Sequence, residues 1–331
     1  MKAEAVNICT SRKRCVLEKQ QKDKLFFSLM DYRNNLFMSS DSKKIKEFYD
    51  GFETVDELIE WMKERPNGAS YIHEVEGEKD IIVVIPTADF NGKYARECRE
   101  NIFKGLHMIF VESGEVPDPY FNIARNVSIG IKKAMVYKPK WIVVSGDDMY
   151  KIDDVDVLVR QLRNINEEDY NVVFAKPSIY HTVPSKIIRI NFLYNLFNLI
   201  TNYDAGRIRV KLHRKFKIEF TSMKAKYATI FSFFQKGYYF LDPLDFLVYS
   251  YKFLEQVMGN VLDETFINGG EDEDVALRVS VEGGKFKIID YRIGDYISMS
   301  FGRNNIRWIM NVANLCYFNF KWRDRLRNLT S

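Results

Sequence analysis

Short apolar runs alternate with amphipathic segments between residues 79 and 175. The apolar runs are IIVVI (81–85), HMIFV (107–111), WIVV (141–144) and NVVFA (171–175). They are rich in β-branched residues, which is typical of strands buried on both faces. The segments between them, 93–104, 121–137 and 153–165, carry apolar side chains at helical spacing. Strands that alternate with helices predict right-handed βαβ units and a mainly parallel sheet flanked by helices.

A further helix is expected before the first strand. Thr54 and Glu57 form a capping-box pattern, and the apolar residues that follow lie on one helical stripe up to residue 62. Residues 1–46 are basic and weakly periodic, which favours a loosely packed arm over a nucleic-acid arm. We therefore expect an N-terminal basic and helical extension over residues 1–78.

Composition narrows the class of protein. Of the 331 residues, 46% are hydrophobic and 28% charged, which excludes a largely disordered chain. The net charge of +4 is too balanced to indicate nucleic acid by itself. The four cysteines form no CxxC pair, so we expect reduced thiols and a cytoplasmic location. No signal peptide and no apolar run of spanning length is recognised in the sequence.

Small polar or acidic residues follow the expected strands. These segments are Pro86-Thr87-Ala88-Asp89, Glu112-Ser113-Gly114 and Ser145-Gly146-Asp147-Asp148. Ligands of such sheets bind at the carboxyl ends of the strands. Neither GxxxxGK[ST] nor GxGxxG occurs in the sequence. Their absence argues against a P-loop nucleoside triphosphatase and against a Rossmann site for a dinucleotide.

Asp147 and Asp148 are candidate metal ligands. Adjacent carboxylates repel each other unless they are exposed or bind a cation, and Mg²⁺ or Mn²⁺ prefers oxygen ligands. The alternative is that these acids simply cap the next helix. At this point both interpretations remain open.

A second acidic cluster lies in LDETFINGGEDEDVALRV. After Gly269 and Gly270, four successive acids (271–274) open a helix that is expected to end before Gly283. Acids in a first helical turn are favoured by the helix dipole, and Asp274 can pair with Arg278 at i,i+4. Capping explains part of the pattern, and a carboxylate here can also act as a general base.

Taken together, these motifs resemble the family 2 glycosyltransferases of the GT-A fold. IIVVIPTAD resembles their opening strand and turn, and Ala124, Arg125 and Asn126 match their Ala-Arg-Asn helix. WIVVSGDD stands where the family has its DxD motif, with Ser145 in place of the first acid. DETFINGGEDEDVALR resembles their Asp-Glu-x-Phe and Gly-Glu-Asp-x-Asp stretches. Where the family often closes its metal site with a histidine, this chain offers Asp295, Ser298 or Ser300.

The resemblance implies an inverting transfer of a sugar from a nucleotide-diphospho-sugar donor. Asp147, with Asp148, would hold Mn²⁺ or Mg²⁺ on the diphosphate, and Asp272 would be the base, with Glu271 as its rival. The implied nucleotide-sugar site comprises Pro86, Thr87, Asp89, Glu112, Arg125, Asn126, Gly146, Asp147 and Gly270. Arg125 either contacts phosphate or pairs with an acid at the sheet edge.

The resemblance also divides the chain. It implies a GT-A domain over 79–302, with a nucleotide-binding half (79–176) and an acceptor half (177–302). The acceptor would be a glycan, a lipid carrier or a protein. Residues 176–236 are strongly basic and aromatic. Such a segment fits a solvated face or a binding surface for an anionic acceptor. It also fits peripheral association with the anionic inner face of a membrane. The basic aromatic stretch 303–331 is either an interfacial helix or a terminal helix docked on the core.

Two other functions compete with this interpretation. A sugar-phosphate nucleotidyltransferase uses a similar sheet and metal-binding carboxylates, but PTADFNGKYAR is a poor triphosphate loop. A degenerate, non-catalytic GT-A binding protein is favoured by Ser145 and by the missing histidine. Nucleic acid is not favoured as a partner, because no recognised module accompanies the basic arm.

Overall fold

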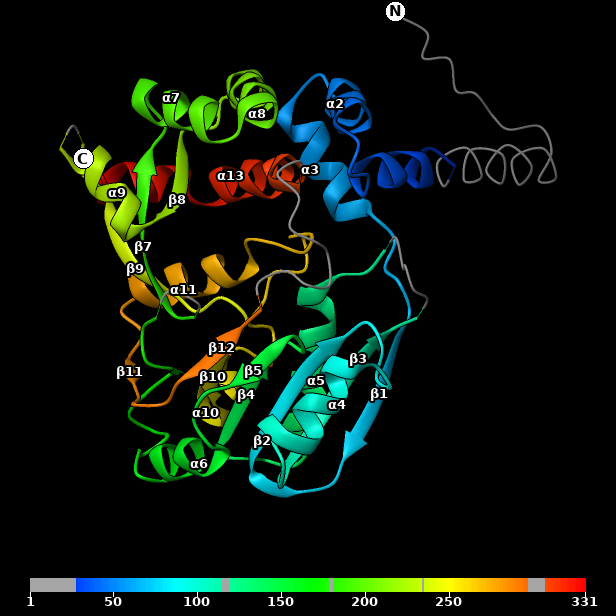
Figure 1. Ribbon diagram of the computed structural model, residues 1–331, viewed down its shortest axis with the longest axis vertical. Helices are drawn as coiled ribbons and strands as arrows, with labels where there is room; N and C mark the ends of the chain where they lie inside the picture. Colours follow the sequence, from blue (N-terminus) through cyan, green and yellow to red (C-terminus); the bar gives the residue numbers. More distant parts are fainter. Residues whose placement is uncertain (1–27, 115–119, 179–180, 234, 297–306) are drawn as a thin grey trace, which may run out of the picture.

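The computed structural model describes residues 28–114, 120–178, 181–233, 235–296 and 307–331 (Figure 1). A 7-stranded sheet in the order β1-β3-β2-β4-β10-β6-β11 forms the centre of one half of the molecule. Its strands are β1 (Ser70–Val75), β2 (Glu78–Thr87), β3 (Leu106–Ser113), β4 (Trp141–Ser145), β6 (Val172–Phe174), β10 (Phe246–Ser250) and β11 (Phe286–Ile288).

The sheet is mainly parallel. β2 is parallel to both β3 and β4, and β11 is parallel to β6. β10 runs antiparallel between β4 and β6, and β1 is an antiparallel edge strand beside β3. The predicted α/β class is therefore confirmed. β1 lies inside the expected N-terminal extension, so the sheet begins before residue 79.

The central strands carry apolar runs because both faces of the sheet are covered there. In β2, Ile81, Val83 and Ile85 pack on one face, and Ile82 and Val84 pack on the other. Helix α4 (Lys93–Glu97), its π-helical continuation η1 (Cys98–Ile102) and α6 (Val155–Arg163) cover the first face. Helices α5 (Ile123–Met135), α10 (Tyr251–Gln256) and α11 (Glu271–Val281) cover the second. The predicted order of strands and helices between 79 and 175 is thus confirmed.

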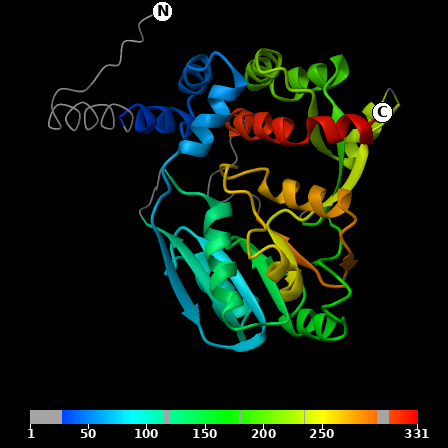
Figure 2. The ribbon, with the colours of Figure 1, turned by 180° about the vertical axis from the view of Figure 1, so that it is seen from behind.

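The other half of the molecule is built from segments distant in sequence. It contains residues 28–37, which are helical, α2 (Ser42–Asp50), α3 (Val55–Glu64), α7 (Phe192–Thr201), α8 (Tyr203–Lys215), α9 (Ala225–Ser232), α12 (Arg307–Met310) and α13 (Val312–Leu329). A sheet of β7 (Val183–Arg189), β8 (Phe220–Lys224) and β9 (Tyr238–Asp242) joins them, and β5 (Met149–Lys151) pairs with β12 (Ile293–Asp295). Figure 2 shows α13 running across this half beside α3.

An aromatic core binds the N-terminal and C-terminal helices together. Phe37, Phe48 and Trp61 pack against one another, with ring centroids 4.9–5.5 Å apart. The buried side chains of α13, including Cys316 and Trp322, belong to the same cluster. Of the two interpretations of the C-terminal stretch, the helix docked on the core is therefore confirmed for residues 312–329.

Three further expectations concern the basic arm, the cysteines and membrane-spanning helices. Residues 1–27, which carry most of the basic arm and Cys9 and Cys15, lie outside the described residues. Cys98 and Cys316 are buried free thiols. Within the described ranges, no helix combines the length and apolarity needed to cross a bilayer.

Tyr49 provides a polar connection between the terminal helices, and its removal gives a first prediction. The buried hydroxyl donates to the carbonyl oxygens of Ile309 (2.9 Å) and Met310 (3.0 Å) and accepts from the amide of Ala313 (3.0 Å). Tyr49→Phe should lower the free energy of unfolding by about 1–3 kcal/mol, because buried backbone groups lose their partner. Urea denaturation measures this change. The exposed Tyr71→Phe is the control, and an equal loss in both variants would contradict the assignment.

Candidate functional site

A glycine at the end of β4 lets two acidic side chains approach each other. Gly146 donates its amide hydrogen to the carbonyl oxygen of Asp245, at 2.8 Å. A Cβ atom at position 146 would lie 3.2 Å from the Asp245 Cβ and 3.3 Å from the Asp148 Oδ1. The absence of a side chain therefore allows the loop after β4 to pack against the turn before β10.

Asp148, Asp245 and Asp295 form a compact carboxylate trio at this edge. One oxygen from each lies within 4.8 Å of the others. Asp295 is brought there by β12, which pairs with β5 so that Asp295 faces Met149. The amide of Tyr296 adds a hydrogen bond to the Asp148 carbonyl, at 3.1 Å. Three separate parts of the chain thus contribute to one acidic group.

The trio has the donor chemistry of a site for a hard divalent cation. All of its ligand atoms are carboxylate oxygens, which Mg²⁺ and Mn²⁺ prefer. Burial raises the pKa of Asp245 well above its usual range, and the charges of Asp295 and Asp148 raise it further. A bound cation would relieve this repulsion, so the residues fit a metal site without selecting one metal.

Asp147 has a different environment from its neighbour Asp148. The Thr87 hydroxyl donates to Asp147 Oδ2 at 2.7 Å, and the Cys98 thiol donates to the Asp147 carbonyl at 3.3 Å. Burial raises the pKa of the Asp147 carboxyl to about 6, although the Thr87 hydrogen bond opposes this. The trio contains Asp148 but not Asp147, so the geometry does not support Asp147 as the leading ligand.

Asp245 was not among the residues that the sequence analysis singled out. It precedes β10, which runs antiparallel to the strands on either side of it. An antiparallel strand starts at the edge where its parallel neighbours end, so an acid before β10 meets the loop after β4. The sequence signal is the Asp-Pro-Leu-Asp segment (242–245) directly before the apolar FLVY run.

Helix α11 brings its acidic first turn toward the same edge. Gly270 caps the helix with φ of +90°, a conformation that favours glycine, and it lies against the ring of Phe266. Burial raises the pKa of Asp272 well above its usual range, and the charges of Glu271, Asp245 and Asp242 add to the effect. The helix dipole favours the ionised form of an acid in this first turn, but burial and neighbouring carboxylates raise the pKa of Asp272 in spite of it.

The neighbours of Asp272 are engaged locally. The buried Glu271 accepts the Gly269 amide hydrogen at 2.7 Å, so its carboxylate stabilises the glycine turn. Burial raises the pKa of Glu273 to about 8, and the charge of Asp242 adds to this while a hydrogen bond with Ser222 opposes it. Asp242 and Glu273 therefore extend the acidic group beyond the trio.

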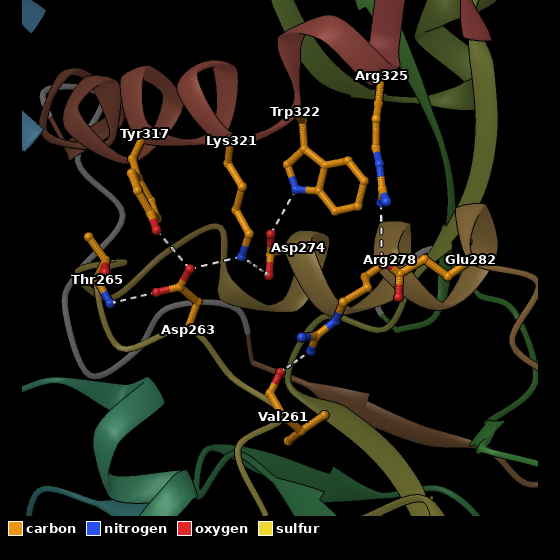
Figure 3. A network of polar contacts seen from close by, with 10 residues as sticks. All are labelled: Val261, Asp263, Thr265, Asp274, Arg278, Glu282, Tyr317, Lys321, Trp322 and Arg325. Atoms are coloured by element: carbon orange, nitrogen blue, oxygen red, sulfur yellow. Dashed lines mark hydrogen bonds and ion pairs between the residues drawn. The ribbon is translucent and has the colours of Figure 1, made fainter. Parts of the chain in front are cut away.

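Asp274 anchors α11 to the C-terminal helix. Its wholly buried carboxylate accepts hydrogen bonds from Trp322 Nε1 (2.7 Å) and Lys321 Nζ (2.9 Å), as Figure 3 shows. The expected pair of Asp274 with Arg278 is wrong, because Arg278 instead donates to the carbonyl of Val261. The ammonium group and the indole of α13 satisfy the buried charge that Arg278 was expected to neutralise.

The loop before α11 is held by the same helix. Asp263 accepts from Lys321 Nζ and the Tyr317 hydroxyl, each at 2.8 Å, and from the Thr265 amide at 3.0 Å (Figure 3). Although burial alone would raise the pKa of Asp263, the Lys321 ammonium holds it below its usual range. The DETF stretch and α11 thus share one support on α13.

Other predicted site residues near β2 and β3 have structural partners. Glu112 accepts from the Phe90 amide at 3.0 Å and lies 2.6 Å from His73 Nε2. Asp89 is exposed, and its carboxylate accepts the Asn91 amide hydrogen at 2.9 Å. Pro86 lies in β2 opposite Val111. Glu112 and Asp89 therefore shape the turn after β2.

The helix residues Arg125 and Asn126 differ in their availability. Arg125 forms a long ion pair with Glu264, at 3.9 Å, and its buried Nε has no hydrogen-bond partner. Of its two expected roles, an ion pair with an acid is present, but that acid, Glu264, lies in the loop between α10 and α11. The buried Asn126 accepts from the Ser70 hydroxyl at 2.6 Å, which ties α5 to β1.

Comparisons with protein-family models, with curated proteins and with solved structures found no match to this chain. The site therefore has to be interpreted from its own chemistry. It can bind a hard cation through the trio and hold a carboxyl group with a raised pKa, Asp272, close by.

The trio predicts a specific pattern of metal stabilisation. Mn²⁺ should raise the thermal midpoint of the wild-type protein, because a ligand that binds the native state stabilises it. Asp245→Asn should abolish this increase, whereas Asp147→Asn should retain most of it. In chelator, Asp245→Asn should be at least as stable as wild type, since one repelling carboxylate is gone. Loss of the increase in Asp147→Asn alone would contradict the trio.

Gly146 gives an independent test of the same geometry. Gly146→Ala inserts a methyl group 3.2 Å from the Asp245 Cβ and 3.3 Å from the Asp148 Oδ1, so these two side chains must shift from their positions. We expect Mn²⁺ affinity to fall about tenfold, which corresponds to ~1.4 kcal/mol. Calorimetric titration with Mn²⁺ measures the affinity. Unchanged affinity would mean that the close approach at Gly146 has no role in binding.

Proposed function

We propose that this protein is a metal-dependent, inverting glycosyltransferase of GT-A type that uses a nucleotide-diphospho-sugar donor. The observation that carries the proposal is the carboxylate trio Asp148, Asp245 and Asp295 at the sheet edge, with Asp272 beside it. This edge is where the parallel strands β2 and β4 end, and it is where ligands of such sheets bind.

The chemistry of sugar transfer requires compensation of diphosphate charge. Asp148, Asp245 and Asp295 would hold Mn²⁺ or Mg²⁺, which when bound supplies Lewis-acid neutralisation of the leaving diphosphate. Arg125 would add positive charge, because its guanidinium is only weakly paired with Glu264. Thr87 and Asp147, which share a hydrogen bond, would border the bound donor at the end of β2 and β4.

The acceptor hydroxyl must lose its proton as the sugar moves. Asp272 is the proposed acceptor of that proton. It lies in the acidic first turn of α11, whose position is fixed by the Asp274 contacts with α13. Glu271 is less suited to this role because its carboxylate accepts the Gly269 amide.

A donor panel tests the proposal directly. UDP-, GDP- and dTDP-sugars are added with and without Mn²⁺, and the thermal midpoint is measured. We expect at least one nucleotide sugar to raise the midpoint in a Mn²⁺-dependent way. Absence of any metal-dependent increase across the panel would refute the proposal.

The products formed by the same samples separate the competing functions. Slow release of free sugar and nucleoside diphosphate from the donor supports the transferase. Donor binding without any turnover would favour the non-catalytic GT-A protein. Release of pyrophosphate from a nucleoside triphosphate and a sugar phosphate would favour the nucleotidyltransferase.

Substitution of the proposed base gives a quantitative prediction. Asp272→Asn keeps the shape and removes the basicity, so turnover of the donor should fall roughly 10²- to 10⁴-fold while donor affinity changes little. Glu271→Gln is the matched variant, because its amide oxygen can still accept from Gly269, and it should retain most of the activity. The opposite result would assign the base to Glu271, and full activity in both variants would make this acidic turn structural.

A further inference from the structure

Helix α7 presents an apolar stripe to solvent. Its sequence, FLYNLFNLIT, has no charged residue. Phe192 is 75% exposed, Leu196 39% and Ile200 74%, and their i,i+4,i+8 spacing places them on one face. A surface helix of a globular protein normally turns its apolar face inward. The outward orientation of this stripe therefore calls for a partner.

Helix α9 extends this stripe. Phe197 of α7 packs on Phe231 and Tyr227 of α9, with ring centroids 5.9 and 6.5 Å apart. Next to this contact, Ile230 is 61% exposed and Phe233 is 92% exposed. We call the exposed residues Phe192, Leu196, Ile200, Ile230 and Phe233 the α7–α9 surface. Such a grouping is unusual for a surface that faces only water.

Positive charge lies beside the α7–α9 surface, on helix α8. Helix α8 packs against α7, and the two lie together at one end of the molecule in Figures 1 and 2. Arg207, Lys211 and Arg214 are exposed along α8. Arg207 also stacks on the exposed Tyr203, 4.1 Å from the ring centroid.

Acidic residues are scarce in the same part of the chain. Between residues 186 and 236 the sequence contains Asp204 and Glu219 as its acids, and Glu219 is paired with Arg327. The surroundings of the apolar stripe are therefore net positive, which is the charge that complements anionic lipid headgroups.

We propose that the α7–α9 surface docks on a bilayer that contains anionic lipids. The apolar side chains would enter the boundary between headgroups and acyl chains, while Arg207, Lys211 and Arg214 would remain among the headgroup phosphates. A second copy of this chain fits less well, because a two-fold contact would bring the same basic residues against each other. Helix α13, by contrast, packs its buried side chains in the core.

The test is co-sedimentation of the full-length protein with phosphatidylcholine vesicles, with and without phosphatidylglycerol. We expect binding to the vesicles with phosphatidylglycerol, weakened by salt because surface charges are screened. Phe192→Ser with Ile200→Ser should reduce the partition coefficient by about tenfold or more, through loss of apolar burial. Lys211→Glu with Arg214→Glu should reduce it at least about fivefold at low salt.

Matched controls come from an exposed part of the chain far from this surface in sequence. Val136→Ser with Lys132→Glu changes an exposed apolar residue and an exposed basic residue at the end of α5, and it should bind vesicles like wild type. All variants should keep the wild-type thermal midpoint, because the altered side chains are exposed.

Two results would overturn the proposal. One is failure of the wild-type protein to bind vesicles with phosphatidylglycerol at low salt. The other is vesicle binding that the α7 and α8 variants leave unchanged. If the wild-type protein instead self-associates in sedimentation velocity and Phe192→Ser with Ile200→Ser abolishes this without any vesicle binding, the surface is an interface between copies of the chain.

Discussion

Mutual repulsion among carboxylates at one edge of the sheet is the constraint on which this structure depends. Asp148, Asp245 and Asp295 converge there, and Asp272 with Glu273 adds further negative potential. Such crowding costs stability in the metal-free chain, because each carboxylate disfavours the charge of its neighbours and because Asp148 and Asp295 are buried. The fold must therefore hold these groups in place with contacts made elsewhere. Strand pairing of β5 with β12 and of β4 with β10 places the trio, and α13 holds the acidic turn of α11. Lys321 and Trp322 donate hydrogen bonds to Asp274 in the first turn of α11, and Lys321 also donates to Asp263 in the preceding loop.

The terminal segments are part of this support. Helix α13 packs in the same aromatic core as the helices of residues 28–64, and Tyr49 bonds to the backbone where α12 passes into α13. The position of α11 over the sheet edge thus depends on residues from both ends of the described chain. A division into extensions and a central domain describes the sequence pattern. The contacts show that the C-terminal helix, itself packed against the N-terminal helices, holds α11 and its acidic turn in place.

The sequence allowed prediction of the strands and helices whose burial leaves a regular pattern of apolar residues along the chain. β2, β3, β4 and β6 are buried on both faces, so their apolar runs were recognisable, and Thr54 does cap α3 through the Glu57 amide. β1 was not expected, because its residues alternate between partly and fully exposed positions at an edge. Asp245 was missed because its place beside Asp148 comes from the antiparallel insertion of β10, which no local pattern encodes. The Asp274–Arg278 pair failed for a related reason: helical spacing allowed it, but tertiary contacts with α13 replaced it.

The three-stranded sheet relates the two proposed sites to each other. β9 starts at Tyr238, shortly after Phe233 of the α7–α9 surface, and ends at Asp242, whose charge raises the pKa of Glu273 and Asp272. β9 thus connects the segment that follows Phe233 to Asp242, which borders the acidic turn of α11. If both proposals hold, an acceptor embedded in an anionic bilayer would meet the catalytic edge from the β7–β9 side. A water-soluble acceptor would leave the outward stripe of α7 without a role in the reaction. Of the expected acceptors, a lipid carrier therefore agrees best with both proposals.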